Sequence, residues 1–224
     1  MVFRQSSRVY NSIGILIIIF TIISMFSLFE GANAASTPPE KVELPVVQHV
    51  DGIPLKKNGH GVRSINIFGW EINVYVAGFY SAEPLLSEKD VLHSHGRNLP
   101  MQLDFTFLRT VDEGRVALAW TQQLEHSVSY KYEGYESDRD VFIQMFTNTI
   151  ENGGTQTVQL VGDKTIMVDQ GVHKGNIVSR DFQRAFLSMW FGERAVAEDL
   201  KTKLLSGAAH LDAEHKREVA GVRA

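Results

Sequence analysis

The sequence contains no cysteine among its 224 residues. This absence excludes disulfides, thiolate metal sites and a cysteine nucleophile together. A surplus of positive charge is also missing, because 22 lysines and arginines stand against 26 acidic residues and give a formal net charge of −4. Nucleic-acid binding needs a basic field that this composition does not supply, so we set that class of partner aside.

Long hydrophobic runs are absent apart from one, Ile13 to Phe29, which follows Arg4 and Arg8. The next residues, Ala32-Asn33-Ala34, supply the small-x-small pattern that signal peptidase accepts. We therefore predict a secretory signal peptide cleaved after Ala34 and export to the periplasm, a destination that the lack of cysteine fits. The alternative is an uncleaved membrane anchor, because the run reaches the lower limit of a spanning helix, about 17–25 residues.

Four segments follow from this interpretation. Residues 1–34 are the signal peptide, 35–44 a polar lead-in, 45–207 the folded domain and 208–224 a charged C-terminal tail. The mature length is that of one domain with a hydrophobic core. Once the signal peptide is removed, no membrane span is expected.

The first half of the domain has strand patterns. Residues 45–57 and 63–82 carry β-branched and aromatic side chains in partial alternation, and Asn58-Gly59-His60-Gly61 between them is typical of a turn. This pattern predicts two or three antiparallel strands. A short helix is predicted from Ser87, its N-cap, to Gly96. Residues 101–108 alternate apolar and polar side chains, as in a half-buried strand.

The second half changes to helical periodicity and then returns to strands. An apolar residue recurs every four positions from Val116 to Val128, which predicts an amphipathic helix, and a second helix is predicted from near Ser137 to before Gly153. Further predictions are strands at 157–161, 165–168 and 176–178 and two final helices closed by Gly192 and Gly207. Strands and helices in blocks indicate an α+β fold, an antiparallel sheet covered on one side by helices.

Arg63 stands where strand alternation places a core residue. If Gly69-Trp70 form a two-residue hairpin loop, Arg63 pairs with Val76 on an apolar face. A loop one residue longer brings Tyr75 onto that face instead. A charge there needs a partner, because an isolated buried charge costs many kcal/mol and arginine does not deprotonate. Arg63 therefore pairs with an aspartate or carbonyls of the chain itself, reaches water past the sheet edge, or meets the anion of a ligand.

No metal site is expected. His93 and His95 provide two imidazoles, but they do not share a helix face, and no third ligand is near in sequence. We predict that both are solvated. The aromatic residues Trp120 and Trp190 are interpreted first as core residues and second as walls of a ligand site.

Two segments resemble the chalcone isomerase family. Gly59-His60-Gly61-Val62-Arg63, Gly69 and Gly78-Phe79-Tyr80 keep the spacing of a motif in the plant enzymes, and Asp181 to Leu205 resembles the closing helices of an exported bacterial branch. The resemblance covers residues 45–207. It implies an open-faced antiparallel β-sheet covered by a layer of α-helices, in agreement with the periodicity.

The catalytic set of the family is incomplete in this sequence. In the plant isomerases an arginine, a threonine and a tyrosine stabilise the enolate formed as a phenolate adds to an enone. By position, Arg63 matches that arginine and Tyr75 takes the place of the threonine. The tyrosine, the asparagine and the late serine or threonine fall near Asp112, Ala119 and Gln183. We therefore assign no catalytic residue, and Arg63 with Tyr75 are the candidates if the protein is an enzyme.

Relatives without the catalytic set include fatty-acid-binding proteins and members associated with haem. The resemblance therefore implies an apolar acidic ligand, a fatty acid or haem, whose anion Arg63 meets. Tyr75 and Gln183 are the further ligand-binding residues in this prediction.

Two other functions stay open at this point. One is an isomerase acting on a substrate other than a chalcone, which is favoured if Tyr75 lies on the Arg63 side of the hairpin. The other is a structural or partner-binding domain of the envelope. That function is favoured if Arg63 pairs internally and Trp120, Phe146 or Trp190 fill the cleft.

Overall fold

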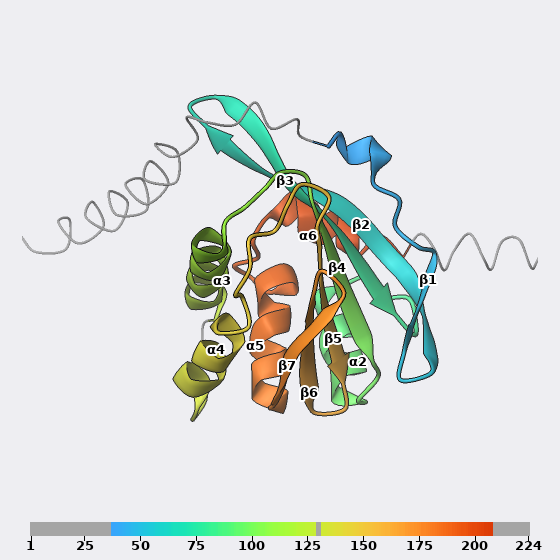
Figure 1. The fold of residues 1–224 in the computed structure, drawn as a ribbon. Helices are drawn as coiled ribbons and strands as arrows, with labels where there is room; N and C mark the ends of the chain where they lie inside the picture. Colours follow the sequence, from blue (N-terminus) through green and yellow to red (C-terminus); the bar gives the residue numbers. More distant parts are fainter. Residues whose placement is uncertain (1–36, 129–130, 208–224) are drawn as a thin grey trace, which may run out of the picture. The chain divides into compact units, whose positions relative to one another are not determined.

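The computed structural model describes residues 37–128 and 131–207, so the predicted signal peptide and the C-terminal tail lie outside the described residues. The described chain forms one antiparallel sheet of seven strands in which neighbours in sequence are neighbours in space (Figure 1). The strands are β1 (Val47–Val50), β2 (Ile53–Ile67), β3 (Trp70–Ser81), β4 (Met101–Phe107), β5 (Thr155–Val161), β6 (Lys164–Asp169) and β7 (Val172–Val178).

Helices form a layer on one face of this sheet. They are the α-helices α2 (Glu88–Gly96), α3 (Glu113–Ser127), α4 (Tyr135–Ile143), α5 (Arg180–Phe191) and α6 (Glu198–Leu204). The 3-10 helix η1 (Pro39–Lys41) precedes β1 and contributes no buried residue. The arrangement confirms the predicted α+β fold. In the described part of the chain, no helix combines the length and the apolar character needed to cross a bilayer.

Three hairpins of the sheet turn in the same way. Asp51-Gly52, Phe68-Gly69 and Gln170-Gly171 each place a non-glycine residue at a φ near 50° before a glycine at a φ of 75° to 87°. Two successive residues of positive φ match the right-handed twist of the flanking strands, which is why such turns favour tight hairpins. The loop between β2 and β3 is therefore Phe68-Gly69, and the predicted loop Gly69-Trp70 is wrong by one residue.

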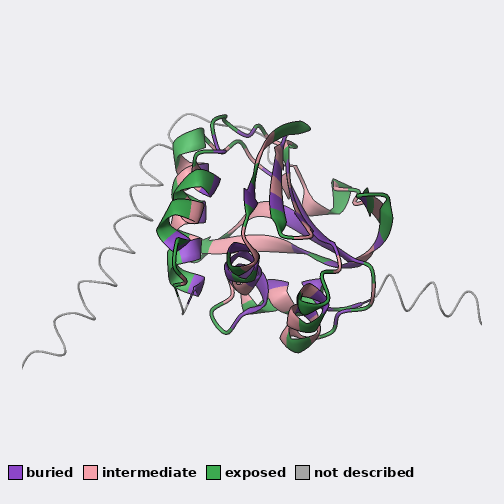
Figure 2. Cartoon of the chain, turned by 90° about the horizontal axis from the view of Figure 1, so that it is seen from below, coloured by how far each residue is buried: buried purple, intermediate pink, exposed green. Residues whose placement is uncertain are grey.

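The core lies between the sheet and the helices, and Figure 2 shows buried residues on the sides of these elements that face each other. Alternation along β4 sends Leu103 and Phe105 into this core and Gln102 and Asp104 to the opposite face. All four are buried, because β4 is the central strand and the opposite face is also covered. The prediction of a half-buried strand is therefore wrong for β4.

The helix starts follow capping rules, whereas one helix end does not follow the sequence pattern. The side chains of Ser87, Asp112 and Ser179 each accept a hydrogen bond from a backbone N–H in the first turn of their helix. The helix predicted to continue to Gly153 ends at Ile143. Ile150 instead exchanges two backbone hydrogen bonds with Val111, of 2.8 and 2.9 Å, and this pairing competes with the helix.

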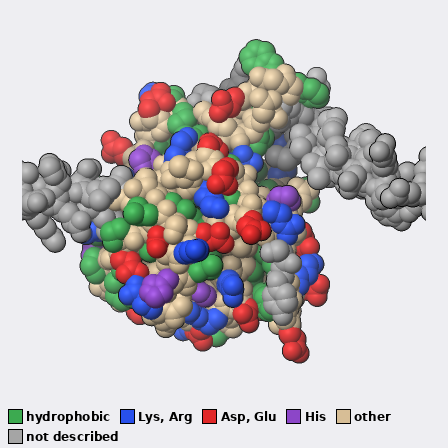
Figure 3. Space-filling model, turned by 180° about the vertical axis from the view of Figure 1, so that it is seen from behind, with side chains coloured by type: hydrophobic (Ala, Val, Ile, Leu, Met, Phe, Trp, Pro, Cys, Tyr) green, Lys and Arg blue, Asp and Glu red, His purple; other side chains and the backbone are tan. Residues whose placement is uncertain are grey.

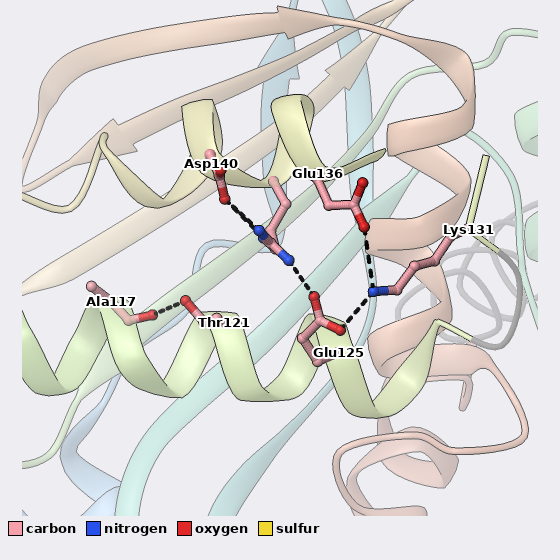
Figure 4. A network of polar contacts seen from close by, with 7 residues as sticks. Ala117, Thr121, Glu125, Lys131, Glu136 and Asp140 are labelled. Carbon is pink, nitrogen blue, oxygen red and sulfur yellow. Dashed lines mark hydrogen bonds and ion pairs between the residues drawn. The ribbon is translucent and has the colours of Figure 1, made fainter. Parts of the chain in front are cut away.

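An ion-pair network joins α3 to α4 (Figure 4). Glu125 of α3 lies 2.5 Å from Arg139 and 3.0 Å from Lys131, and these two cations also contact Asp140 and Glu136. All of these charged side chains are at least partly exposed to solvent. Each ion pair therefore contributes at most about 1 kcal/mol to the stability of the fold. The network therefore orients α4 on α3 more than it stabilises the fold.

Residues 58–61 lie inside β2, and the predicted turn there is wrong. Asn58 sits at a register shift in the β2–β3 ladder and is fully buried. Its amide nitrogen donates to the carbonyls of Leu85 and Leu204, at 2.7 and 2.8 Å, and its oxygen accepts from the N–H of Leu85. These bonds satisfy the buried amide side chain, and the backbone carbonyl of Asn58 accepts a hydrogen bond from the hydroxyl of Ser206 at 3.2 Å.

The glycines that follow Asn58 allow a close approach of α6 to β2. A β-carbon at Gly59 would overlap the backbone carbonyl of Lys203, and one at Gly61 would lie 2.9 Å from the side chain of Leu200. Glycine is therefore needed here for the close packing of α6, against its backbone at Gly59 and its side chains at Gly61, and not for a turn.

Candidate functional site

Arg63 and Tyr75 lie directly opposite each other on β2 and β3. The ladder pairs Arg63 with Tyr75 and then Ser64 with Asn73, so Val74 is the extra residue of a β-bulge. The earlier hairpin loop and this bulge together replace the predicted partner Val76 by Tyr75. Residues that oppose each other across a ladder share one face, so the guanidinium and the phenol belong to the same side of the hairpin.

Tyr75 is half-buried among aromatic rings. Its ring centroid lies 5.5 Å from Phe105, 5.7 Å from Phe107 and 6.3 Å from Trp190. Burial raises the pKa of the Tyr75 phenol, and the positive charge of Arg63 acts in the opposite direction without cancelling that effect. Tyr75 therefore stays protonated at ordinary pH and is a neutral hydrogen-bond donor.

Arg63 is half-buried and donates a hydrogen bond to the backbone carbonyl of Ser64. Within residues 37–128 and 131–207, no carboxylate forms a salt bridge with it. A guanidinium has five N–H donors in a fork, so most of its donor capacity is left over. The arrangement suits a planar anion such as a carboxylate.

Trp190, which the sequence indicated first as a core residue and second as a wall of a ligand site, also supplies a hydrogen-bond donor. Its side chain is 3% exposed, and its indole N–H has no hydrogen-bond acceptor among the described residues. A buried N–H of this kind usually finds a partner, because leaving it unpaired costs about 1–3 kcal/mol. The contact with Tyr75 places this unsatisfied donor in the same ring cluster as the candidate anion site.

The apolar interior beside this site is filled by aromatic side chains. Trp120 stacks on Phe146 at 5.4 Å and on Phe186 at 6.0 Å, and it meets Trp190 edge-on at 5.9 Å. Phe105 and Phe142 complete the set, which we call the aromatic cluster. An apolar tail can enter this region only if some of these rings move.

Gln183 does not lie with Arg63 and Tyr75. It is buried in the first turn of α5, where it lies 3.0 Å from Nε2 of His95 and donates to the carbonyl of Lys164. Lys164 belongs to the end of the sheet where Leu160 pairs with Met101, whereas Tyr75 pairs with Phe107 at the other end of β4. Six residues of strand, about 20 Å, separate the two ends. The structure thus brings two of the three predicted ligand residues together.

The two histidines of α2 differ from each other. His93 is exposed as predicted, but His95 is half-buried and bonded to Gln183, so the prediction of a solvated side chain is wrong for His95. Burial is the main cause that lowers the pKa of His95, and the nearby charge of Arg180 adds to it. In the described part of the chain, no three metal-binding side chains gather.

Asp112 and Ala119 have no part in the candidate site. Asp112 is the N-cap of α3, where its carboxylate accepts from the N–H of Arg115 and pairs with the side chain of the same residue. Ala119 is exposed on α3. Neither residue replaces the hydrogen-bond donors that the plant isomerases place at these positions.

A cavity of about 250 Å³ opens elsewhere, between α2, the end of α3 and α5. Its lining includes the charged residues Glu88, Arg184, Glu193 and Arg194 and does not include Arg63 or Tyr75. Charged walls suit an alkyl chain poorly, because an apolar ligand leaves their polar groups without partners. We therefore centre the candidate site on Arg63, Tyr75 and Trp190.

Comparison with known proteins identifies the family of this chain and a solved structure with a similar fold. The family model described as chalcone isomerase-like matches residues 37–206. The structure is similar to that of a fatty-acid binding protein of Arabidopsis thaliana, with a TM-score of 0.65 and 15% sequence identity, covering 79% of this chain and 97% of that one. No curated protein matches the chain. At 15% identity the structural likeness establishes the fold alone.

Proposed function

Because the chain belongs to the chalcone isomerase-like family, we propose that it is a non-catalytic binding protein for an apolar acid, a fatty acid in the first place, whose carboxylate pairs with Arg63. The observation that supports this proposal is the half-buried guanidinium that faces the phenol of Tyr75 and has no carboxylate partner among the described residues. The Arg63 fork binds the two carboxylate oxygens, and Tyr75 donates a further hydrogen bond.

The alkyl chain is proposed to enter the aromatic cluster. That region is closed in this structure, so binding selects a conformation in which rings beside Tyr75 have moved. Haem is the alternative ligand, because it is also an apolar acid. A haem carries two propionates, whereas the described site offers the single guanidinium of Arg63, and a fatty acid is the better match.

The proposed place of action is the periplasm. Support comes from the basic residues Arg4 and Arg8, the apolar run that follows and the cleavage pattern Ala32-Asn33-Ala34.

The test of the proposed site is the Arg63→Ala variant titrated with dodecanoate. We expect its affinity to fall by about 2–5 kcal/mol, the range for truncating one partner of a buried charge pair. The fluorescence of Trp120 and Trp190 reports binding, because both lie in the aromatic cluster. Without ligand, Arg63→Ala is expected to melt at or above the wild-type temperature, because an unpaired half-buried cation is a liability.

Arg184→Ala is the matched control, because Arg184 is exposed and lines the polar cavity instead. It is expected to bind dodecanoate like the wild type. Loss of affinity in Arg184→Ala with no loss in Arg63→Ala would place the acid in that cavity. A large loss of stability in ligand-free Arg63→Ala, with unchanged affinity, would make Arg63 part of the scaffold.

Two observations favour other functions. Tyr75 lies on the Arg63 side of the hairpin, as an isomerase with these two catalytic residues requires. Stereoselective flavanone formation above the uncatalysed rate, or enone isomerisation lost in Tyr75→Phe, would establish such an enzyme. The closed aromatic cluster instead favours a structural or partner-binding domain. That function follows if neither dodecanoate nor haem changes the melting temperature.

A further inference from the structure

The far end of the β2–β3 hairpin projects beyond the helical layer (Figure 1). Its tip carries Phe68, 82% exposed, and Trp70, 77% exposed, the two highest values among the exposed large hydrophobic side chains of the described residues. Figure 3 shows hydrophobic side chains gathered at this end of the molecule. The tip thus exposes two large aromatic side chains to solvent, two positions apart in the sequence.

The turn itself does not account for Phe68. This residue adopts a φ of 50°, in the left-handed region that asparagine and glycine occupy at much lower cost than an aromatic residue. The tip is ordered without help from the phenyl ring, because the side chain of Asn66 accepts a hydrogen bond from the N–H of Gly69 at 3.0 Å. An aromatic residue that is both unfavourable for the turn and exposed points to a contact outside the folded unit.

We propose that this tip, Phe68 with Trp70, inserts into the interface of a lipid bilayer. The inference goes beyond the proposed function and does not depend on it. Tryptophan and other aromatic rings favour the level of the lipid headgroups, where an apolar ring and a polar edge are both satisfied. The backbone near the tip is paired across the hairpin from Ser64–Asn73 to Ile67–Trp70, so shallow insertion leaves few polar groups without partners.

The size of the tip argues for a bilayer over a protein partner. Each ring buries about 150–250 Å², so the pair falls short of the roughly 800 Å² that each partner buries in a stable protein interface. The charge at the tip indicates which lipids it binds. Between Ser64 and Val74 the one charged residue is Glu71, which is exposed. The contact therefore relies on the rings, and anionic lipid is not expected to strengthen it.

Trp70 is also the reporter for the test. The chain has three tryptophans, and Trp120 and Trp190 are 8% and 3% exposed. Iodide in solution therefore quenches Trp70 alone. The first 35 residues contain no tryptophan, so the full-length chain can be used even if its apolar segment binds lipid. The probes are vesicles of phosphatidylcholine, of brominated phosphatidylcholine and of phosphatidylcholine mixed with phosphatidylglycerol.

We expect brominated vesicles to quench the iodide-accessible emission. Neutral and anionic vesicles are expected to protect this emission from iodide to a similar extent. Phe68→Asn is expected to lower this vesicle contact about tenfold and to melt at or above the wild-type temperature, because asparagine suits the left-handed turn. Val178→Thr is the control, since Val178 is 61% exposed on β7, away from the hairpin, and it is expected to behave like the wild type.

Several outcomes would overturn the proposal. If the chain sediments with vesicles while iodide still quenches Trp70, the N-terminal segment binds the lipid and the tip does not. Self-association that Phe68→Asn abolishes, without quenching by bromine, makes the tip a contact between copies. Binding that requires phosphatidylglycerol shows that charge, and not the aromatic tip, drives the contact.

Discussion

At the scale of single residues, Asp104 carries a carboxyl group that is buried in the sheet. It lies on the face of the sheet away from the helices and is 9% exposed. Its carboxylate accepts hydrogen bonds from Gln48, Gln102 and Thr157 at 2.8 to 2.9 Å. Burial nevertheless raises the pKa of Asp104, because desolvation of the anion outweighs these three donors.

The raised pKa gives a prediction with a defined sign. The folded state binds the Asp104 proton more tightly than the unfolded chain, so this group's contribution to stability falls as the pH rises from about 3.8 through the folded pKa. We expect the Asp104→Asn variant to gain stability relative to the wild type across that window, by about 1.4 kcal/mol per pKa unit of the shift. Urea unfolding of both proteins at several pH values measures the difference.

Asp163→Asn serves as the control for this comparison. Asp163 is exposed in the turn between β5 and β6. Its variant should follow the wild type at all pH values. A constant difference between Asp104→Asn and the wild type would mean that the three donors compensate the burial completely.

At the scale of elements, the contact between β2 and α6 leaves no room for a side chain at Gly59. Gly59 lets the backbone of the strand touch the backbone at the end of α6, and Asn58 bonds to the carbonyl of Leu204 in the same place. Both sides of this contact are backbone, which cannot move aside as a flexible side chain can. Gly59, the first residue of the family motif, and Asn58, which precedes it, therefore hold the last described helix on the sheet.

We predict that Gly59→Ala lowers the free energy of unfolding by about 3 kcal/mol, the upper range for overpacking, because the new methyl group meets a backbone carbonyl. Gly96→Ala is the matched control, since a β-carbon at Gly96 meets nothing within 4 Å. Its stability should change by less than about 0.5 kcal/mol. Equal effects of the two substitutions in chemical denaturation would contradict a close approach of α6.

At the scale of the whole molecule, the chalcone isomerase-like fold positions Arg63 and the other residues of the candidate site. A meander of seven strands brings the aromatic cluster, Tyr75 and the hairpin tip to one end of the sheet. The Gln183 network and the cavity lie on other parts of α5. Helix α5 thus contributes to the candidate ligand site, to the Gln183 network and to the polar cavity. The sequence alone assigned Gln183 to the ligand site.

Export is the prediction that belongs to this scale. If the chain is processed after Ala34, protein recovered from a periplasmic extract should have an intact mass that begins at Ala35. The variants Ala32→Leu and Ala34→Leu should accumulate uncleaved, because a bulky residue does not fit the small-x-small pattern. Wild-type protein found in the membrane fraction with residues 1–34 still attached would identify the segment as an anchor.

The sequence by itself determined the fold class and singled out Arg63 as the centre of the candidate site. Helix α3 follows directly from apolar residues spaced for a single face, and Ser87 and Ser179 cap helices through local hydrogen bonds. Arg63 stood out because a charge in an alternating strand violates a local pattern. These features depend on neighbours a few positions away, so one sequence suffices to predict them.

The tertiary structure decided what faces Arg63. The partner is Tyr75 because the hairpin turns at Phe68-Gly69 and Val74 bulges, and a shift of one position changes the partner and the face. It also decided that Asn58 to Gly61 continue a strand, since α6 approaches Asn58 from 146 residues away along the chain. Packing likewise decided that Gln183 lies at the end of the sheet opposite to Tyr75. Such contacts are set by packing between distant segments, which local propensity does not encode.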